Sequence, residues 1–227
     1  MDALDRRLGL IYEMTRPGRA AADIGSDHGR LIAALVRSGR TPRGVATDIR
    51  PKPLQKTKEL VARLGLEDRV DCLLCDGLAE VSSQMADEII IAGMGGELIA
   101  RIIDSWPYSA QQDKRFLLQP MTRPEALREY LYTHGFFIEE ERCAVQSGHA
   151  YSVMAVRYTG QKREPTPRER YLGMIADFGD PASREYARRL LSRLTLKADG
   201  MEKSGKDAGG WRALAAETEK LIEEGTP

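Results

Sequence analysis

Short apolar runs alternate with amphipathic stretches from the N-terminus to about residue 133. The apolar runs have the length of buried strands and lie at residues 20–24, 44–48, 69–75, 87–92 and 115–119. The amphipathic stretches repeat apolar residues at helical spacing and lie at about 3–14, 28–38, 52–64, 95–104 and 123–133. Strand and helix in alternation predict a parallel sheet with helices on both faces, because each right-handed crossover carries its helix over the sheet.

After Gly135 the pattern changes to two long strand-like segments, 136–145 and 149–158, with only three residues between them. A connection this short predicts an antiparallel hairpin at one end of the sheet. Five parallel strands closed by such a hairpin are the layout of a class I methyltransferase, a doubly wound, Rossmann-like α/β fold. A dinucleotide-binding Rossmann domain ends without the hairpin, so the class I methyltransferase fold is the prediction.

The last part of the chain carries no strand pattern. Residues 161–167 are polar and rich in proline, which predicts a linker. Beyond it, apolar residues recur at helical spacing over 187–201 and again over 211–222, with a break at 204–210. Two helices with one apolar stripe each should pair into an antiparallel hairpin. We therefore predict an α/β domain of residues 1–160 and a small helical, coiled-coil-like domain of residues 161–227.

Composition narrows the class of protein. The 227 residues are 42% hydrophobic and 30% charged, with 34 basic and 34 acidic side chains, so no overall charge attracts nucleic acid or membranes. No apolar run approaches the roughly 20 residues of a membrane span, and the N-terminus lacks a signal-peptide core. We expect a cytoplasmic protein and favour a monomer. Cys72 and Cys75 form a C-x-x-C pair without a second pair of ligands nearby, so we expect no metal site.

Polar residues or glycines follow every predicted strand. In a doubly wound sheet, ligands bind outside the carboxyl ends of the strands, so these residues are the candidates for a binding site. The five strand tips are Asp23-Ile24-Gly25-Ser26-Asp27-His28-Gly29, Thr47-Asp48, Asp76-Gly77, Ala92-Gly93-Met94-Gly95-Gly96 and Gln119-Pro120. Such residues at a single tip carry little information, whereas at all five tips they indicate a site.

The first three tips have the chemistry of an adenosine pocket. Gly25 permits a sharp turn and a close approach of a ligand to the backbone. Asp48 follows it by about 20 residues, the spacing at which an acid accepts hydrogen bonds from ribose hydroxyls. Asp76 is placed to accept a hydrogen bond from an adenine amino group, and Gly77 leaves room for the ring.

The first tip favours S-adenosylmethionine (SAM) over a dinucleotide. A dinucleotide requires G-x-G-x-x-G, with bare amides for the pyrophosphate. The chain instead has the carboxylate of Asp27 between Gly25 and Gly29, and a carboxylate there would repel a pyrophosphate. SAM has no phosphate and carries an ammonium and a sulfonium, for which Asp23 and Asp27 are suitable partners. Structural alternatives stay open: Asp27 as a helix cap, residues 76–77 as an ordinary turn, and residues 93–96 as a tight turn.

At these residues the chain resembles the bacterial tRNA (adenine-22-N1)-methyltransferases. The matching segments are "ADIGSDHGRL" at 22–31, "CDGLAE" at 75–80, "IIIAGMGGELI" at 89–99 and "LLQP" at 117–120, followed by "LREYLYTHGFFIEEE". They lie in the family's order within residues 4–158, and the family also ends in a small helical, coiled-coil-like domain. Two positions depart from the family pattern. Gly29-Arg30-Leu31-Ile32 stand where members usually carry Ala-Tyr-Leu-Pro, and Asp48 stands where they usually carry Glu.

The resemblance implies transfer of a methyl group from SAM to N1 of adenine 22 in tRNA, with the base flipped out of its stack. Asp27 is the first candidate to stabilise the charge on the adenine or to accept the N6 proton, and His28 is the second. The candidates for cofactor binding are Asp23, Gly25, Ser26, Asp27, Asp48, Asp76, Gly77, Gly93, Met94 and Gly95. A SAM-dependent methyltransferase of a small molecule or a protein, and a SAM-binding protein without catalysis, are the alternatives.

The C-terminal helices carry a candidate surface for the tRNA. Residues 162–206 contain 11 Lys and Arg against 7 Asp and Glu. Arg189, Arg193 and Lys197 recur every four residues and therefore share one face of a helix. This basic stripe either contacts tRNA phosphates or is an ordinary solvated surface.

Overall fold

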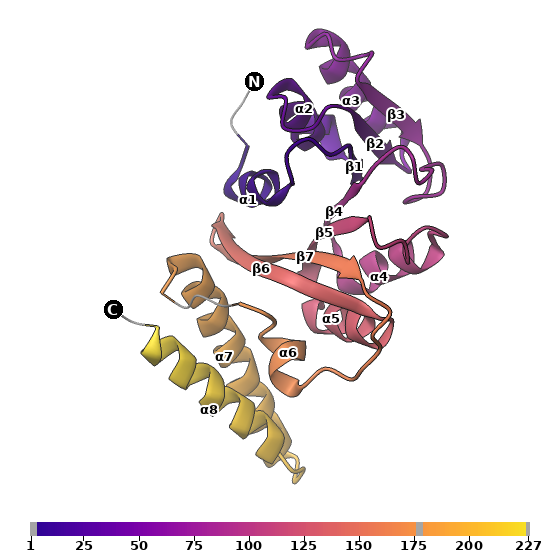
Figure 1. The fold of residues 1–227 in the computed structure, drawn as a ribbon. Coiled ribbons are helices and arrows are strands. Elements are labelled where there is room, and N and C mark those ends of the chain that lie inside the picture. Colours follow the sequence, from indigo (N-terminus) through magenta and orange to yellow (C-terminus); the bar gives the residue numbers. More distant parts are fainter. Residues whose placement is uncertain (1–3, 176–178, 226–227) are drawn as a thin grey trace.

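The computed structural model describes residues 4–175 and 179–225, which include one seven-stranded sheet (Figure 1). The strand order is β3-β2-β1-β4-β5-β7-β6. The first five strands are parallel, and β7 is antiparallel to both β5 and β6. The bounds are β1 (Ala21–Ile24), β2 (Gly44–Asp48), β3 (Val70–Leu74), β4 (Glu88–Gly95), β5 (Arg115–Thr122), β6 (Phe136–Gln146) and β7 (His149–Tyr158). The predicted sheet, with its hairpin at one edge, is confirmed.

Helices cover both faces of this sheet. Successive residues of β4 alternate between the two resulting cores: Ile90 packs with α1, α2 and α3, whereas Ile89 and Ile91 pack with α4 and α5. Burial on both faces is the reason that this strand is a continuous apolar run. The helices are α1 (Arg6–Met14), α2 (Arg30–Arg37), α3 (Pro51–Arg63), α4 (Gly96–Ser105) and α5 (Pro124–Thr133).

Two strands are longer than the sequence predicts. β4 continues beyond residue 92 to Gly95, and β5 continues beyond residue 119 to Thr122. The two strands keep pairing past the expected ends, with register shifts around Met94 that mark a β-bulge. The fourth tip is therefore a bulged strand end and not a tight turn. The glycine run does not disclose this, because the pairing partner is the backbone of another strand.

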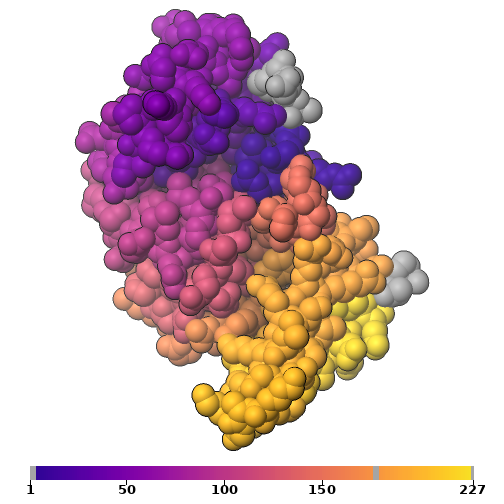
Figure 2. All heavy atoms as spheres, turned by 180° about the vertical axis from the view of Figure 1, so that it is seen from behind, coloured from indigo at the N-terminus to yellow at the C-terminus, as the bar shows by residue number. Residues whose placement is uncertain are grey.

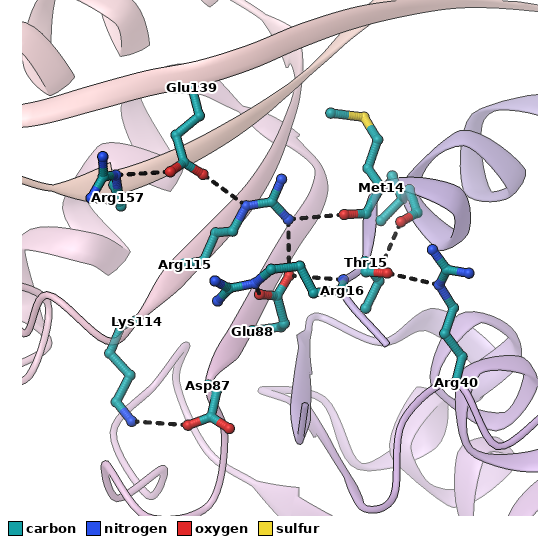
Figure 3. A network of polar contacts seen from close by, with 11 residues as sticks. Met14, Thr15, Arg16, Arg40, Asp87, Glu88, Lys114, Arg115, Glu139 and Arg157 are labelled. Carbon is teal, nitrogen blue, oxygen red and sulfur yellow. Dashed lines mark hydrogen bonds and ion pairs between the residues drawn. The ribbon is translucent and has the colours of Figure 1, made fainter. Parts of the chain in front are cut away.

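A buried polar network ties α1 to the amino ends of β4 and β5 (Figure 3). The carboxylate of Glu88 has no exposed surface and pairs with Arg16 and with Arg115, whose Nη1 lies 3.1 Å from Glu88 Oε2. Arg115 Nη1 also donates to the carbonyl of Met14, at the end of α1, over 2.9 Å. The network therefore holds the C-terminal end of α1 against the sheet.

The C-terminal helices form a lobe that projects beyond the rest of the molecule (Figure 2). Its helices are α6 (Pro167–Tyr171), α7 (Pro181–Lys203) and α8 (Gly209–Glu224). Side chains of α7 and α8 share one apolar cluster, which includes Leu190 and Leu214 and also Cys143 of β6. The two predicted helices are present, whereas α6 was not predicted. This apolar cluster contains residues from both sides of residue 160, since Cys143 belongs to β6. The division into two domains at residue 160 therefore stays a prediction.

Arg128 of α5 lies at the junction between this lobe and the sheet and is fully buried. Its Nη2 donates to Glu141 Oε1 of β6 over 2.6 Å and to the Tyr186 hydroxyl of α7 over 3.0 Å. Its Nη1 donates to the carbonyls of Arg170 and Tyr171 in α6, over 3.1 and 3.0 Å. The ion pair thus joins α5 to β6, and the other hydrogen bonds of Arg128 connect both to α6 and α7.

The residues that the structure describes contain neither a candidate metal cluster nor a helix that could span a membrane. Among them, no group of three or more His, Cys, Asp or Glu side chains could hold a metal ion. Cys72, Cys75 and Cys143 are free thiols. No helix in this part of the chain is both long enough and apolar enough to span a membrane.

Candidate active site

A cavity of about 1110 Å³ opens at the carboxyl ends of the parallel strands. It lies where β1 and β4 are neighbours and the strand order reverses. Ten predicted site residues line it: Asp23, Gly25, Ser26, Asp27, His28, Asp48, Asp76, Gly77, Gly93 and Met94. Gly95 does not line the cavity. It is the N-cap of α4, where a Cβ would lie 3.2 Å from Thr122 Oγ1.

The end of β1 forms a tight turn around the carboxylate of Asp23. Gly25 has a φ of +69°, a left-handed conformation that favours glycine, and a Cβ at this position would displace the methyl carbon of Met94. Ser26 donates its hydroxyl to Asp23 Oδ2 over 2.6 Å. Thr57 of α3 holds the turn by donating to the Ser26 carbonyl over 3.0 Å.

Asp23 is the most deeply buried titratable group at this tip, with 6% of its surface exposed. Burial raises the pKa of its carboxyl to about 6, although the Ser26 hydrogen bond and the positive charge of Arg7 both lower it. Within the described residues the carboxylate has a hydrogen-bond donor but no ion-pair partner. A bound cation would therefore offset the cost of burying this charge.

Asp27 and His28 form a 3-10 turn, η1 (Asp27–Gly29), at the edge of the cavity. His28 has a φ of +64°, a left-handed conformation that is strained for a residue with a side chain. The side chain of Asp27 is 68% exposed, and its Oδ1 lies 3.6 Å from His28 Nε2. That nitrogen accepts a hydrogen bond from the Lys56 ammonium over 2.9 Å. The N-cap of α2 is Gly29, and Asp27 makes no capping hydrogen bond, so the helix-cap alternative is not supported.

The second and third tips meet in the same cavity. Asp48 is 5% exposed, and its Oδ1 accepts a hydrogen bond from the backbone N–H of Arg50 over 2.8 Å. The Gly77 carbonyl accepts from the Thr47 hydroxyl over 3.0 Å, which joins the two tips. A Cβ at Gly77 would lie 3.1 Å from a methyl group of Ile102, so a larger residue would crowd the wall.

Arg7 is a cavity residue that sequence patterns do not single out. Its Nη1 donates to Oε1 of the buried Gln119 over 2.9 Å. The same oxygen accepts from the backbone N–H of Gly93 over 3.1 Å, and Gln119 Nε2 donates to the Pro120 carbonyl over 3.0 Å. Arg7 lies in a helix of ordinary amphipathic pattern, far from the other site residues in sequence. A glutamine at the end of a buried apolar strand was the available signal.

The sheet order and this cavity define a class of protein, the class I methyltransferases. Residues 4–154 match the family model "Methyltransferase domain". The chain is 32% identical over 151 residues to the tRNA (adenine(22)-N(1))-methyltransferase of Bacillus subtilis, a match that covers 66% of this chain and 63% of that protein. It belongs to this methyltransferase family, and its similarity to the Bacillus subtilis protein agrees with the resemblance that the sequence motifs predict.

Two further comparisons support this likeness, and one of them covers nearly the whole chain. A protein of Mycoplasma pneumoniae named "Putative tRNA methyltransferase" is 30% identical over 180 residues, which cover 75% of this chain and 79% of that one. A crystal structure from Streptococcus pneumoniae, described as a putative tRNA (m1A22) methyltransferase in complex with SAM, superimposes with a TM-score of 0.80. That match has 25% identity and covers 99% of this chain and 100% of the other, so it includes the C-terminal helices.

Proposed function

We propose that this protein transfers a methyl group from SAM to N1 of adenine 22 in tRNA. One observation carries the proposal: the acids of three successive strand tips, Asp23, Asp48 and Asp76, line one cavity where the strand order reverses. The Bacillus subtilis relative is named for this reaction, and the Streptococcus pneumoniae structure is a complex with SAM. Both likenesses support extending these properties to this chain.

The cavity residues fit SAM by charge and by space. Asp23 would hold the ammonium of the methionine part, since a bound cation offsets the burial of this carboxylate. Asp48 would accept hydrogen bonds from the ribose hydroxyls, and Asp76 beside Gly77 would border the adenine. Gly25 would allow the cofactor to approach the backbone of the first tip, because no side chain stands there. Ser26, Gly93 and Met94 would complete the wall.

SAM, when bound, supplies an electrophilic methyl group. The residues of this chain must hold the adenine so that N1 lies in line with this methyl group. They must also stabilise the positive charge that methylation leaves on the base. Asp27, exposed beside His28, is placed to oppose that charge or to accept a proton from N6. Leu98 and Met121 are 40% and 44% exposed in the cavity lining and offer apolar surface for a flipped base.

Methylation of unmodified tRNA transcripts with labelled SAM, followed by mass spectrometry of the nucleosides, tests the proposal. We expect 1-methyladenosine in a transcript with adenine 22 and no label in a matched transcript with guanine 22. Label in N6-methyladenosine, or equal label in both transcripts, contradicts the proposal. Methylation of small molecules or proteins alone would support the first alternative, and SAM binding without transfer to any acceptor would support the second.

Asp27→Asn should slow methyl transfer without unfolding the protein. The change keeps the size and hydrogen-bonding capacity of the side chain but removes its charge. We expect kcat to fall by more than about tenfold, which is ~1.4 kcal/mol of barrier, with the affinity for S-adenosylhomocysteine and the melting temperature nearly unchanged. Single-turnover rates with saturating tRNA measure the effect. A rate within about threefold of the wild type, ~0.7 kcal/mol, would remove Asp27 from the chemistry.

The basic stripe of α7 provides a separate prediction about the tRNA. Arg189, Arg193 and Lys197 are exposed. Arg189 Nε lies 2.7 Å from Glu185, and Lys197 Nζ lies 3.7 Å from the ring centroid of Trp211. Changing all three to alanine should weaken tRNA binding and reduce its salt dependence by a slope of up to about 3. Filter binding across a salt series measures both quantities.

The controls for this triple variant are its affinity for SAM, which should not change, and its melting temperature. The second control is needed because the Lys197–Trp211 contact joins α7 to α8. Unchanged tRNA affinity and slope at low salt would identify the stripe as solvated surface. We also propose that the protein is a monomer, which light scattering would check. Because the proposed substrate is tRNA, we propose that the protein acts in the cytoplasm.

A further inference from the structure

Lys56 of α3 reaches the turn that carries Asp27 and His28, although it does not line the cavity itself. Its Nζ lies 2.9 Å from Nε2 of His28. The same ring nitrogen lies 3.6 Å from Oδ1 of Asp27. Because Asp27 and His28 both belong to the cavity lining, Lys56 acts on the cavity through these two side chains.

The direction of this hydrogen bond fixes the charge of the His28 ring. An ammonium group has three donors and no acceptor, so the imidazole must present a lone pair at Nε2. A ring with a lone pair at Nε2 is neutral and carries its one N–H on Nδ1. The nitrogen that faces Asp27 therefore has no proton, and the imidazole forms no charged pair with the Asp27 carboxylate.

The backbone of the same turn is held by the next residue of α3. Thr57 is fully buried, and its hydroxyl donates to the Ser26 carbonyl over 3.0 Å. Gly29 packs so closely on Thr57 that a Cβ would lie 2.6 Å from Cγ2 of the threonine. Between these two contacts His28 keeps its φ of +64°, a conformation that persists only where the surroundings impose it. Lys56 and Thr57 thus hold the side chain and the backbone of one strained turn.

Other charged side chains surround this turn. Lys52 lies four residues before Lys56 on α3. Those in the cavity lining are Asp5 and Arg7 near the start of the chain, Asp23 of β1, Arg30 of α2, and Asp48 and Arg50 at the end of β2. These charges are the same in the wild type and in a variant of Lys56, so a comparison of the two isolates the effect of the Lys56 ammonium.

We propose that Lys56 is a positioning residue for methyl transfer, which keeps His28 neutral so that the Asp27 carboxylate is free to oppose the charge on the adenine. The proposal rests on the role that the proposed function gives to Asp27. Without the ammonium, Nε2 of His28 takes a proton from the solvent and donates it in a hydrogen bond to Asp27. The resulting ion pair offsets the charge of Asp27 when the methylated base requires it.

The pH dependence of methyl transfer in Lys56→Met tests this role, because methionine replaces the lysine stem without supplying a donor. Measuring kcat with saturating SAM and tRNA excludes effects on binding. Relative to the wild type, the variant should be nearly unchanged at about pH 8.5 and about fivefold slower at about pH 6, where an unpaired imidazole takes up a proton. Lys56→Arg, which keeps a charged donor, should follow the wild type at both pH values.

Lys52→Met is the matched control, because Lys52 is exposed, carries the same charge and lies outside the cavity lining on the same face of α3 as Lys56. It should keep the wild-type pH profile. In Asp27→Asn, the further change Lys56→Met should have no pH-dependent effect, since no carboxylate remains to be paired. A Lys56→Met variant that is equally slow at every pH would show a structural role only, and it would overturn the proposal. A higher KM for tRNA with an unchanged kcat profile would also overturn it and would assign Lys56 to the nucleic acid.

NMR of the imidazole nitrogens tests the charge of His28 without any transfer reaction. The chain has three histidines, and His28→Gln identifies the signals of His28. At about pH 6.5 we expect the neutral ring with its proton on Nδ1 in the wild type and a larger protonated fraction in Lys56→Met. A wild-type ring that is protonated at this pH, or that carries its proton on Nε2, would overturn the proposal. The expected signals in a protein that fails to methylate tRNA would support the contact of Lys56 with His28 and contradict only the tRNA function.

Discussion

Asp23→Asn is expected to weaken SAM binding severely and, at the same time, to make the ligand-free protein more stable at neutral pH. Asparagine keeps the shape of the side chain and an oxygen to accept the Ser26 hydrogen bond. It cannot supply the negative charge that we assign to the ammonium of SAM. Loss of a charge-assisted hydrogen bond costs about 1.5–3 kcal/mol, so affinity should fall by roughly 10- to 100-fold.

The gain in stability follows from the raised pKa of Asp23, about 6 against an ordinary 3.8. Between these two values the folded protein binds the proton more tightly than the unfolded chain does. Stability therefore falls as the pH rises from about 4 to about 6, and the full cost of the buried charge is present above pH 6. At 1.36 kcal/mol per pKa unit, that cost is about 3 kcal/mol. Asparagine removes it, so the advantage of the variant should be greatest at pH 7.5 and vanish below about pH 4.

Urea unfolding at pH 7.5 and at pH 4 measures the stability, and calorimetry with SAM measures the binding. The matched control is Asp27→Asn, because the exposed carboxyl of Asp27 carries no such burial cost. A variant that is less stable than the wild type at pH 7.5, or that binds SAM equally well, would contradict the role assigned to Asp23. In the wild type, SAM affinity should weaken as the pH falls through 6, because the carboxyl must first lose its proton.

Arg128→Met should destabilise the protein by about 3–5 kcal/mol, because it leaves the carboxylate of Glu141 buried without its partner. Both side chains of this pair have no exposed surface. Burial lowers the pKa of Arg128, but Glu141 and Tyr186 raise it by more, so the guanidinium stays charged. The change also leaves the carbonyls of Arg170 and Tyr171 without their donor. We therefore expect the C-terminal lobe to loosen from the sheet.

Urea unfolding measures the loss of stability, and limited proteolysis between residues 161 and 166 measures the loosening. The double variant Arg128→Met, Glu141→Gln should recover much of the stability, because glutamine is uncharged and can still accept the N–H of Met174. Arg189→Met is the surface control, since its pair with Glu185 is exposed and is worth only about 0.3–0.5 kcal/mol. A loss below 1 kcal/mol in Arg128→Met would show that this pair does not hold the lobe.

Most of the fold could be predicted from the sequence because its signals are local. β4 alternates between two cores, so Ile89, Ile90 and Ile91 are all buried and the strand is apolar throughout. The hairpin followed from the three residues between its strands. The bulged continuation of β4 to Gly95 did not follow, because it depends on pairing with β5. The short helix α6 was missed because only five residues form it, inside a segment rich in proline.

The candidate site, like the fold, could be predicted from the sequence only in part. Glycines and acids at successive strand tips are visible in the sequence, and ten of the eleven residues named from them line one cavity. The sequence did not separate the roles of Asp23 and Asp27, which are two acids four residues apart. In the structure the first is 6% exposed, while the side chain of the second is 68% exposed. Their different chemistry therefore comes from burial, which the spacing does not reveal.

The sequence by itself determined the class of fold, the edge of the sheet that carries the site, and the family. These follow from periodicity, turn residues and motifs, which are properties of neighbouring positions. The tertiary structure alone decided which acid has a raised pKa, that Arg7 enters the cavity, and that Arg128 joins the C-terminal lobe to the sheet. Burial and ion pairing decide each of these, and both depend on residues that are far apart in the chain and meet only when it folds.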